Sequence, residues 1–156
     1  MDDSFGSALK YALRLLGYCD RSIVEMRQRL TDKNFPDEVI DKTLFYLEEK
    51  GFVNDRKLAE SLSRDAVGRR HLGAQGVRSY LIKRGISKDI AAEMSEADND
   101  YVGSAMHFVE KRLRSMRHLD SGIIKRRLWG LLARRGYASD EIRQVLELIN
   151  TVKRER

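Results

Sequence analysis

The sequence predicts an all-α fold in which three tandem three-helix repeats, each similar to a helix-turn-helix, form an elongated, curved array. Three observations carry this prediction. Apolar residues recur three and four positions apart, which is the spacing of amphipathic helices and not of strands. The 156 residues include a single proline, so the helical segments are rarely interrupted. One apolar pattern also returns three times at a constant interval, as in arrays of supersecondary units.

The repeat has a period of 51 residues. The positions that recur are Leu30, Leu81 and Leu132, and four residues later Asn34, Gly85 and Gly136. The complete apolar sets are Leu30, Phe35, Ile40 and Leu44; Leu81, Ile86, Ile90 and Met94; and Leu132, Tyr137, Ile142 and Leu146. We expect three-helix units over residues 1–53, 54–98 and 99–156. Units this small share hydrophobic faces with their neighbours, which favours an elongated chain over a sphere.

Helix signals follow one another in order along the first unit. The apolar stripes are Ala8, Ala12, Leu15 and Leu16 for its first helix, and Ile40, Leu44 and Leu47 for its third. Ser22 and Glu25 form a capping box that begins the second helix. Asn34 can adopt the left-handed conformation that ends this helix. Pro36 suits the first turn of the third helix, and Gly51 ends it.

The second unit begins with a cap at Asn54 or Asp55. The stripe of its first helix is Leu58, Ala59, Leu62 and Ala66. Residues 68–76 hold three glycines and are predicted to form a turn before the second helix. Gly85 is expected to end that helix, and Ser87 to begin the third.

The third unit starts with a long stripe and a preceding cap at Asp98 or Asp100. The stripe consists of Val102, Ala105, Met106, Val109, Leu113 and Met116. Ser121 is expected to cap the second helix, Gly136 to end it, and Ser139 to cap the last helix.

Composition excludes several protein classes. A lone Cys19 cannot form an internal disulfide framework or a cysteine-based zinc cluster. No apolar run approaches the roughly 18–20 residues that span a bilayer. The acidic start, Met1-Asp2-Asp3-Ser4, lacks the basic and apolar regions of a signal peptide. We therefore expect a soluble protein of the cytoplasm with no membrane partner.

Residues that could carry chemistry are not arranged for it. The histidines are His71, His107 and His118, and no two are four residues apart. His107 lies beside an apolar stripe and is expected to pack at its edge. The glycines at 68, 73 and 76 lack the Lys-Ser/Thr ending of a phosphate loop. The sequence therefore predicts a protein that is not an enzyme and that uses no cofactor and no metal.

Charge is distributed unevenly. Residues 1–53 carry 8 basic and 10 acidic side chains, and residues 54–100 carry 9 and 8. Residues 101–156 carry 13 basic and 6 acidic side chains, so the positive surplus lies in the last third. A basic block of this kind attracts polyanions, among which nucleic acid is the most common in a cell. The alternative interpretation is a solvated helical face without a partner.

The predicted helix over residues 121–135 shows how the charge would be presented. At about 100° per residue, Ile124, Leu128 and Leu132 share one side. Arg126, Arg127 and Arg134 lie opposite, around Gly130, where a phosphate backbone could approach closely. Trp129, at the edge of the stripe, is expected to pack between helices rather than to stack on a base. The candidate nucleic-acid or filament contacts are Arg69, Arg70, Lys83, Arg84, Lys111, Arg112, Arg114, Arg117, Lys125, Arg126, Arg127, Arg134 and Arg135. Cations near helix C-termini also complement the helix dipole, which is the other interpretation of Arg84, Arg134 and Arg135.

Two other function classes stay open. Residues 131–142 look like a helix-turn-helix, so a dimeric DNA-binding transcription regulator is one alternative. The helices that would enter the major groove begin with acidic residues, which repel phosphate: Asp37, Glu38 and Asp41; Asp89 and Glu93; Asp140 and Glu141. A helical adaptor that binds only protein is the second alternative.

A set of residues along nearly the whole chain resembles one family. They are Ala8-Leu-Lys-Tyr-Ala-Leu-Arg-Leu-Leu16; Arg21-Ser22 with Glu25 and Leu30; Leu47 and Lys50-Gly-Phe-Val-Asn-Asp55 with Leu58 and Ala59; Arg84-Gly85-Ile86; and Arg134-Arg135-Gly136-Tyr137. From about Ala8 to Leu148 the chain resembles the RecX family of bacterial recombination regulators, and the stretch from Gly51 to Ala59 is most specific. Leu58 stands where many relatives have Phe, and Asn34 where Gly is usual.

The resemblance implies a fold and a function. The fold would be three tandem three-helix repeats. The partner would be the RecA recombinase filament on single-stranded DNA. The protein would lodge in the groove of the filament, limit strand exchange and ATP turnover, and favour disassembly, with no catalytic residues and no cofactor. We further expect a monomer whose basic third touches DNA, single-stranded or double-stranded, or an acidic recombinase surface.

Overall fold

Helical spacing of apolar residues produces helices throughout the part of the chain that the structure describes. The computed structural model describes residues 3–154, with side chains described as far as residue 152. The helices are α1 (Ser4–Tyr18), α2 (Ile23–Asp32), α3 (Asp37–Glu49), α4 (Asp55–Gly68), α5 (Ala74–Lys83), α6 (Lys88–Glu96), α7 (Tyr101–Ser115), α8 (Ser121–Arg134) and α9 (Ser139–Arg154). No strand occurs between residues 3 and 154, so the predicted all-α fold is confirmed.

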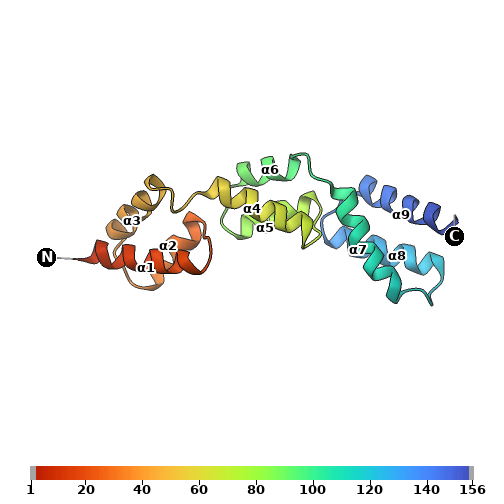
Figure 1. The fold of residues 1–156 in the computed structure, drawn as a ribbon, viewed down its shortest axis with the longest axis horizontal. Helices are drawn as coiled ribbons and strands as arrows, with labels where there is room; N and C mark the ends of the chain where they lie inside the picture. The colour runs from red at the N-terminus through yellow and green to blue at the C-terminus, as the bar shows by residue number, and fades with distance from the viewer. Residues whose placement is uncertain (1–2, 155–156) are drawn as a thin grey trace.

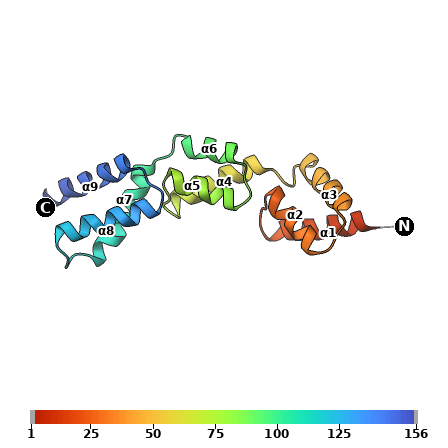
Figure 2. The ribbon, with the colours of Figure 1, turned by 180° about the vertical axis from the view of Figure 1, so that it is seen from behind.

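The helices form three successive groups of three along the longest axis of the molecule. The two termini lie at opposite ends, and the middle group, α4–α6, sits at the top of a shallow arch (Figure 1). The view from behind shows the same succession (Figure 2). The elongated, curved array predicted from the 51-residue period is therefore confirmed.

Each group has its own hydrophobic cluster, within residues 8–53, 58–94 and 105–149 respectively. The side chain of Tyr101, at the start of α7, packs against both the second and the third cluster. The exact unit boundaries after residues 53 and 98 stay a prediction. Within residues 3–154, no helix combines the length and the apolar character that crossing a bilayer requires.

Several helix starts follow from short polar signals. Ser22 accepts a hydrogen bond from the backbone of Glu25 at 3.1 Å, and the Glu25 carboxylate accepts one from Ser22 N at 3.2 Å. This pair is the predicted capping box of α2. The side chains of Asn54, Ser87 and Asp100 cap α4, α6 and α7, and each accepts one hydrogen bond from a backbone N–H of the first turn. Each cap satisfies a backbone N–H that would otherwise lack a partner.

Some predicted boundaries were wrong by one or a few residues. Asp120, rather than Ser121, caps α8, because its carboxylate lies 3.0 Å from Gly122 N. Ser139 is the first residue of α9, not its cap, and Pro36 precedes α3 instead of lying in its first turn. The predicted turn over residues 68–76 is also shorter, because α5 begins at Ala74.

The turns at the recurring positions share one conformation. Asn34, Gly85 and Gly136 have φ values of 62°, 84° and 86°, which is the left-handed region expected of them. In the two later units, this turn packs on the unit before it. The turn at Gly85 faces the start of α2, and the turn at Gly136 faces the start of α5. We call these contacts the first junction and the second junction.

Candidate nucleic-acid interface

The side of α8 that faces away from its unit carries positive charge alone. Residues 121–134 contain no Asp or Glu. Ile124, Leu128 and Leu132 are buried in the third cluster, so the opposite side of the helix faces solvent. The exposed cations on α8 are Lys125, Arg126, Arg127 and Arg134. We call these four residues the outer face of α8.

Gly130 lets an arginine lie close to the α8 backbone. A Cβ placed on Gly130 would be 3.4 Å from Nη1 of Arg134. The guanidinium of Arg134 therefore folds back over the glycine, one turn along the helix. Its planar donors thus lie on the side of the helix that also carries Arg126, where they can bind phosphate oxygens.

A second group of cations gathers at the second junction. The guanidinium carbons of Arg135 and Arg112 lie 4.2 Å and 5.2 Å from the centre of the Phe108 ring. The Arg135 side chain also donates a hydrogen bond to the backbone carbonyl of Arg70. Helix α7 and the α8–α9 turn thereby bring two arginines together on one aromatic ring, and the α4–α5 loop is joined to them through the carbonyl of Arg70. The π face partly compensates their mutual repulsion.

Asp65 neutralises part of the charge in the α4–α5 loop. Its carboxylate lies 3.7 Å from Nε of Arg69 and 3.2 Å from Nε of Arg70. Arg70 also stacks over the Tyr80 ring at 4.6 Å. One carboxylate serves two guanidinium groups, and the Arg69 side chain is 88% exposed. The loop therefore keeps a positive surplus.

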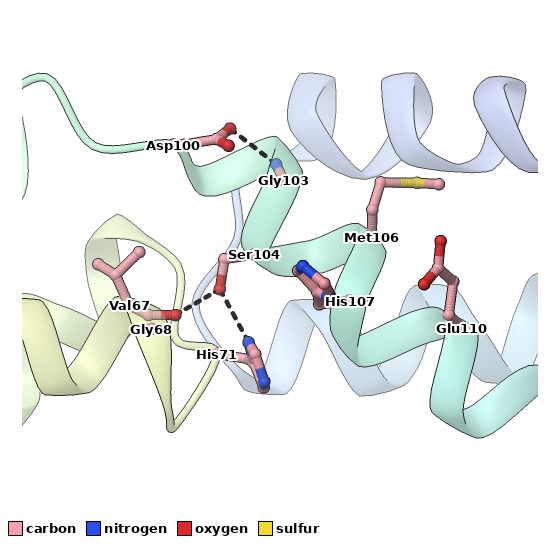
Figure 3. Close-up of a pocket in the computed structure, with 9 residues that line it drawn as sticks. All are labelled: Val67, Gly68, His71, Asp100, Gly103, Ser104, Met106, His107 and Glu110. Carbon is pink, nitrogen blue, oxygen red and sulfur yellow. Dashed lines mark hydrogen bonds between the residues drawn. The ribbon is translucent and has the colours of Figure 1, made fainter.

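A shallow pocket of about 570 Å³ lies beside this cluster, between the end of α4 and the start of α7 (Figure 3). The rings of His71 and His107 face each other across it with centroids 6.4 Å apart. Carboxylates of Asp100 and Glu110 also line it. The described residues contain no group of three or more His, Cys, Asp or Glu side chains that could hold a metal ion.

Ser104 fastens the two sides of this pocket together. Its Oγ donates to the carbonyl of Val67 at 2.5 Å, so the same oxygen accepts from His71 Nδ1 at 3.1 Å and from the Tyr137 hydroxyl at 3.3 Å. His71 therefore carries its hydrogen on Nδ1. Because the serine hydrogen goes to a backbone carbonyl, the histidine does not act as its base.

Two pKa shifts follow from this environment. The pKa of His71 lies below its ordinary value because of burial, with further contributions from the positive charges of Lys111, His107 and Arg135. The pKa of Tyr137 is raised, chiefly by burial. Both shifts favour the uncharged forms, and the neutral Tyr137 hydroxyl keeps the hydrogen that it donates to Ser104.

The remaining candidate residues lie apart from these two groups. Arg114 and Arg117 line a separate depression of about 510 Å³ together with Ile149 and Val152. Lys83 is exposed at the end of α5. Arg84 is engaged at the first junction, where its Nε lies 3.3 Å from both carboxylate oxygens of Glu25. This ion pair leaves Arg84 poorly placed to bind phosphate.

The cations of the third unit are not neutralised internally. Among the residues that the structure describes, the following lysines and arginines form no ion pair: Lys111, Arg112, Arg114, Arg117, Lys125, Arg126, Arg127, Arg134 and Arg135. The positive surplus seen in the sequence is therefore available to an external anion.

Trp129 is partly covered by the protein. On α8 it lies roughly 100° from the centre of the buried stripe, at the edge that the sequence predicted. Its side chain is 36% exposed, so one part is covered and another part faces solvent. Its packing between helices stays a prediction.

Comparison with known proteins agrees with this architecture. Family models described as "RecX, first three-helix domain" and "RecX, third three-helix domain" match residues 8–47 and 99–146. A "Regulatory protein RecX" from Chlorobium phaeobacteroides (strain BS1) is 32% identical over 144 residues, which cover 91% of this chain and 93% of that protein. This chain belongs to the RecX family.

Other RecX proteins match over most of their length. One from Pelodictyon phaeoclathratiforme (strain DSM 5477 / BU-1) is 28% identical and is covered to 92%. The crystal structure of RecX from Lactobacillus salivarius superposes with a TM-score of 0.87 at 21% identity, over 97% of this chain and 99% of that one. A second crystal structure, of regulatory protein RecX, gives 0.83 at 18% identity, over 93% of this chain and 74% of that one. The structural likeness shows the RecX fold, and family membership supports a regulator of the RecA recombinase in general terms.

Proposed function

We propose that this chain regulates homologous recombination by binding the RecA filament on single-stranded DNA, inhibiting its ATPase and strand exchange and promoting its disassembly. RecX family membership supports the recombinase as partner. The observation that carries the DNA contact is the set of unpaired cations in the described part of the third unit. In this proposal the protein works in the cytoplasm, without a cofactor and without catalytic residues.

In this proposal, two separate surfaces of the protein contact the filament. The outer face of α8 offers an acid-free row of cations to a phosphate backbone. Arg112 and Arg135 on the Phe108 ring, together with Arg70 and Lys111 nearby, offer a second positive surface at the second junction. An elongated arch can follow a filament and contact it with both surfaces at once. Arg84 is left out because Glu25 already holds it.

The repeat geometry supports a monomer. At each junction the receiving surface is the start of a second helix, at residues 22–25 in the first unit and 73–76 in the second. The period places the same positions of the third unit at residues 124–127, but these lie inside α8, which begins earlier, at Ser121. The third unit therefore has no free helix start at this position, and stacking of further copies by the same contact stops there.

The main test removes three cations of the outer face of α8. The triple variant Arg126→Ala, Arg127→Ala, Arg134→Ala is expected to lose binding to the RecA–DNA filament with unchanged helicity, and to lose inhibition of the filament ATPase. The control triple Lys10→Ala, Arg29→Ala, Lys57→Ala changes the net charge equally, using exposed residues outside the third unit. Wild-type binding by the first triple would contradict the claim for this face.

Salt dependence gives a second readout. Binding to single strands weakens with a slope of about 0.7 in log–log form for each phosphate neutralised. If all three arginines contact phosphates, the first triple should lower the slope by about 2, and the control triple should leave it unchanged. A protein-only adaptor would bind the filament with little salt dependence.

The alternative transcription-regulator function receives no support from the helices that would read bases. Helices α3, α6 and α9 each carry one or two acidic residues in the first turn. Carboxylates there repel phosphate at the edge of the groove. Competition between random DNA and promoter DNA distinguishes the two functions, since only the regulator would prefer a sequence.

A further inference from the structure

The exposed indole of Trp129 lies on the basic side of α8. On a helix, residues three and four positions away are neighbours on the surface. For Trp129 they are the exposed Lys125 and Arg126 toward the N-terminus, and the buried Leu132 and the exposed Ala133 toward the C-terminus. The next residue, Gly130, has no side chain. The covered side of the ring therefore lies toward Leu132, and its exposed part lies beside two cations and small residues that leave room for a flat partner.

Nothing within the described chain explains this exposure. Trp129 takes no part in the aromatic pairs or cation–π contacts formed by residues 3–152, and it lies outside the third hydrophobic cluster. A single exposed aromatic ring is common on protein surfaces, and what sets Trp129 apart is its place beside the cations of an acid-free helix.

We propose that Trp129 stacks on an unpaired base of a single-stranded nucleic acid, while Lys125 and Arg126 hold the phosphates on either side. This inference rests on the proposed function and names the form of nucleic acid that α8 takes. In a duplex both faces of each base are covered by neighbouring base pairs, whereas in a single strand they are accessible to an indole ring. Aromatic stacking together with neighbouring cations is the general mode of single-strand binding.

The charge around the ring favours nucleic acid over a protein partner. No carboxylate occurs on α8, and its exposed side combines four cations with one aromatic ring. An apolar protein surface would pack against further apolar residues around the indole, but Trp129 has cations and small residues beside it. The complementary partner is therefore a polyanion that carries flat apolar groups.

Because the chain contains one tryptophan, its intrinsic fluorescence reports on this site alone. Titration of the isolated 156-residue chain with an oligothymidylate should quench the fluorescence, with the same dissociation constant that anisotropy of a labelled strand gives. Trp129→Ala should weaken strand binding by about fivefold or more, and Trp129→Phe should retain most of the affinity. An abasic strand of equal length should bind the wild type and Trp129→Ala equally, without quenching.

A matched control is Phe45→Ala, which removes a side chain that is 68% exposed in the acidic first unit. This variant should bind the strand as the wild type does, and circular dichroism should show unchanged helicity for both alanine variants. Strand binding with unquenched fluorescence and equal affinity for Trp129→Ala would overturn the stacking site while leaving the proposed function standing. Absence of any strand binding by the wild type would overturn the stacking site together with the DNA contact of the proposed function.

Discussion

The two junctions occupy the same place in the repeat but are built from different groups. At the first junction, side chains make the polar contacts. Arg84 pairs with Glu25, and the Asp55 carboxylate accepts a hydrogen bond from Ile23 N at 3.0 Å. A Cβ on Gly85 would meet side-chain atoms, Ser22 Oγ at 2.6 Å and Val24 Cβ at 2.8 Å. Within residues 3–154, no backbone–backbone hydrogen bond crosses this junction.

At the second junction, backbone meets backbone. Gly73 N donates to the carbonyl of Arg135 at 2.9 Å, and Gln75 N donates to the carbonyl of Gly136 at 3.2 Å. A Cβ on Gly73, Gly76 or Gly136 would overlap backbone atoms of the other unit. The period pairs Glu25 of the first junction with Gly76 of the second, so a glycine stands where the first junction has its carboxylate.

The two junctions therefore differ in rigidity: the second is fixed, and the first is adjustable. Side chains can change rotamer at modest cost, whereas two backbones joined by hydrogen bonds move only together. The second junction therefore fixes the positions of Arg70, Arg112 and Arg135 relative to one another. The first junction leaves the acidic first unit more freedom to adapt to a partner. The following predictions test this contrast, from the largest expected effect to the smallest.

Replacing the turn glycines should separate the junctions most clearly. Gly136→Ala and Gly85→Ala share the strain of a left-handed alanine, about 1–2 kcal/mol. Gly136→Ala also drives a methyl group into the backbone of α5, so we expect a total loss of about 3–4 kcal/mol in the free energy of unfolding. Gly85→Ala should lose less, about 2–3 kcal/mol, because Ser22 Oγ can rotate away, whereas Val24 Cβ moves only with its backbone. Urea unfolding followed by circular dichroism measures both, and equal losses would contradict the contrast.

Gly76→Ala tests the close approach of the two backbones at the second junction without adding the strain of a positive φ. Gly76 lies within α5 and has no positive φ, so alanine alone should favour the helix by about 1 kcal/mol. Its Cβ would, however, overlap the carbonyl oxygen of Arg135, and we expect a net loss of about 1–2 kcal/mol in unfolding free energy. Polyanion binding should weaken as well, since Arg135 would be displaced.

The control for this prediction is Gly17→Ala in α1. Nothing lies within 4 Å of the Cβ that it adds, so stability should be unchanged or rise by up to about 1 kcal/mol. If Gly76→Ala behaved like this control in urea unfolding, the close contact at the second junction would not contribute to stability.

Sequence patterns predicted the parts of the fold that depend on nearby residues. The capping box at Ser22 and the left-handed turns at Gly85 and Gly136 were found because each signal lies within a few positions. Gly73 and Gly76 were interpreted as turn glycines, although they serve contacts with a turn about sixty residues later. Local reasoning has no access to such a pairing, because only the folded chain brings the two segments together.

The candidate site shows the same limit. The sequence predicted the acid-free row on α8, because helical spacing alone places its arginines. It could not distinguish Arg84, held by a carboxylate 59 residues away, from Arg126, which has no ion-pair partner among the described residues. Aligning the repeats indicates that the ion pair belongs to the first junction alone, because Glu25 aligns with Gly76 in the second unit and has no acidic counterpart there.

The next prediction concerns the ion pair of the first junction. A double-mutant cycle with Arg84→Ala and Glu25→Ala should give a coupling of about 0.5–1 kcal/mol, because both side chains are more than two-thirds buried, although one N–H of Arg84 is shared between the two carboxylate oxygens. The cycle cancels the loss of the Glu25 capping contact, which both Glu25 variants share. Urea unfolding at low and high salt measures the coupling, which should shrink as salt rises.

The matched pair is Arg56 with Glu93, which joins α4 to α6 inside the second unit at 2.9 Å and 3.0 Å. These side chains are more than half exposed, so their coupling should be smaller despite better distances. A larger coupling for this exposed pair would show that burial does not determine the strength of the junction contact.

The smallest effect is a pH dependence confined to the second junction. Burial, together with the positive charges of Lys111, His107 and Arg135, holds the pKa of His71 below the ordinary 6.5. The folded chain therefore binds this proton less readily than the unfolded chain, so the free energy of unfolding should fall as pH drops below about 6.5. Above pH 7.5 His71 is neutral in both states and contributes no further change. Urea midpoints measured at pH 5.5 and pH 8 report the difference.

The variant His71→Gln separates this titration from all others. Glutamine can still donate a hydrogen bond toward Ser104 but carries no charge at any pH, so the loss of stability between pH 8 and pH 5.5 should be smaller than in the wild type. His118→Gln, at an exposed position beyond α7, should leave the wild-type dependence unchanged. Asp100 and Glu110 line the same pocket and are present in every variant, so their contribution cancels in the comparison. Identical pH profiles for His71→Gln and the wild type would mean that the second junction is held by its backbone contacts alone, with no contribution from the charge state of the pocket.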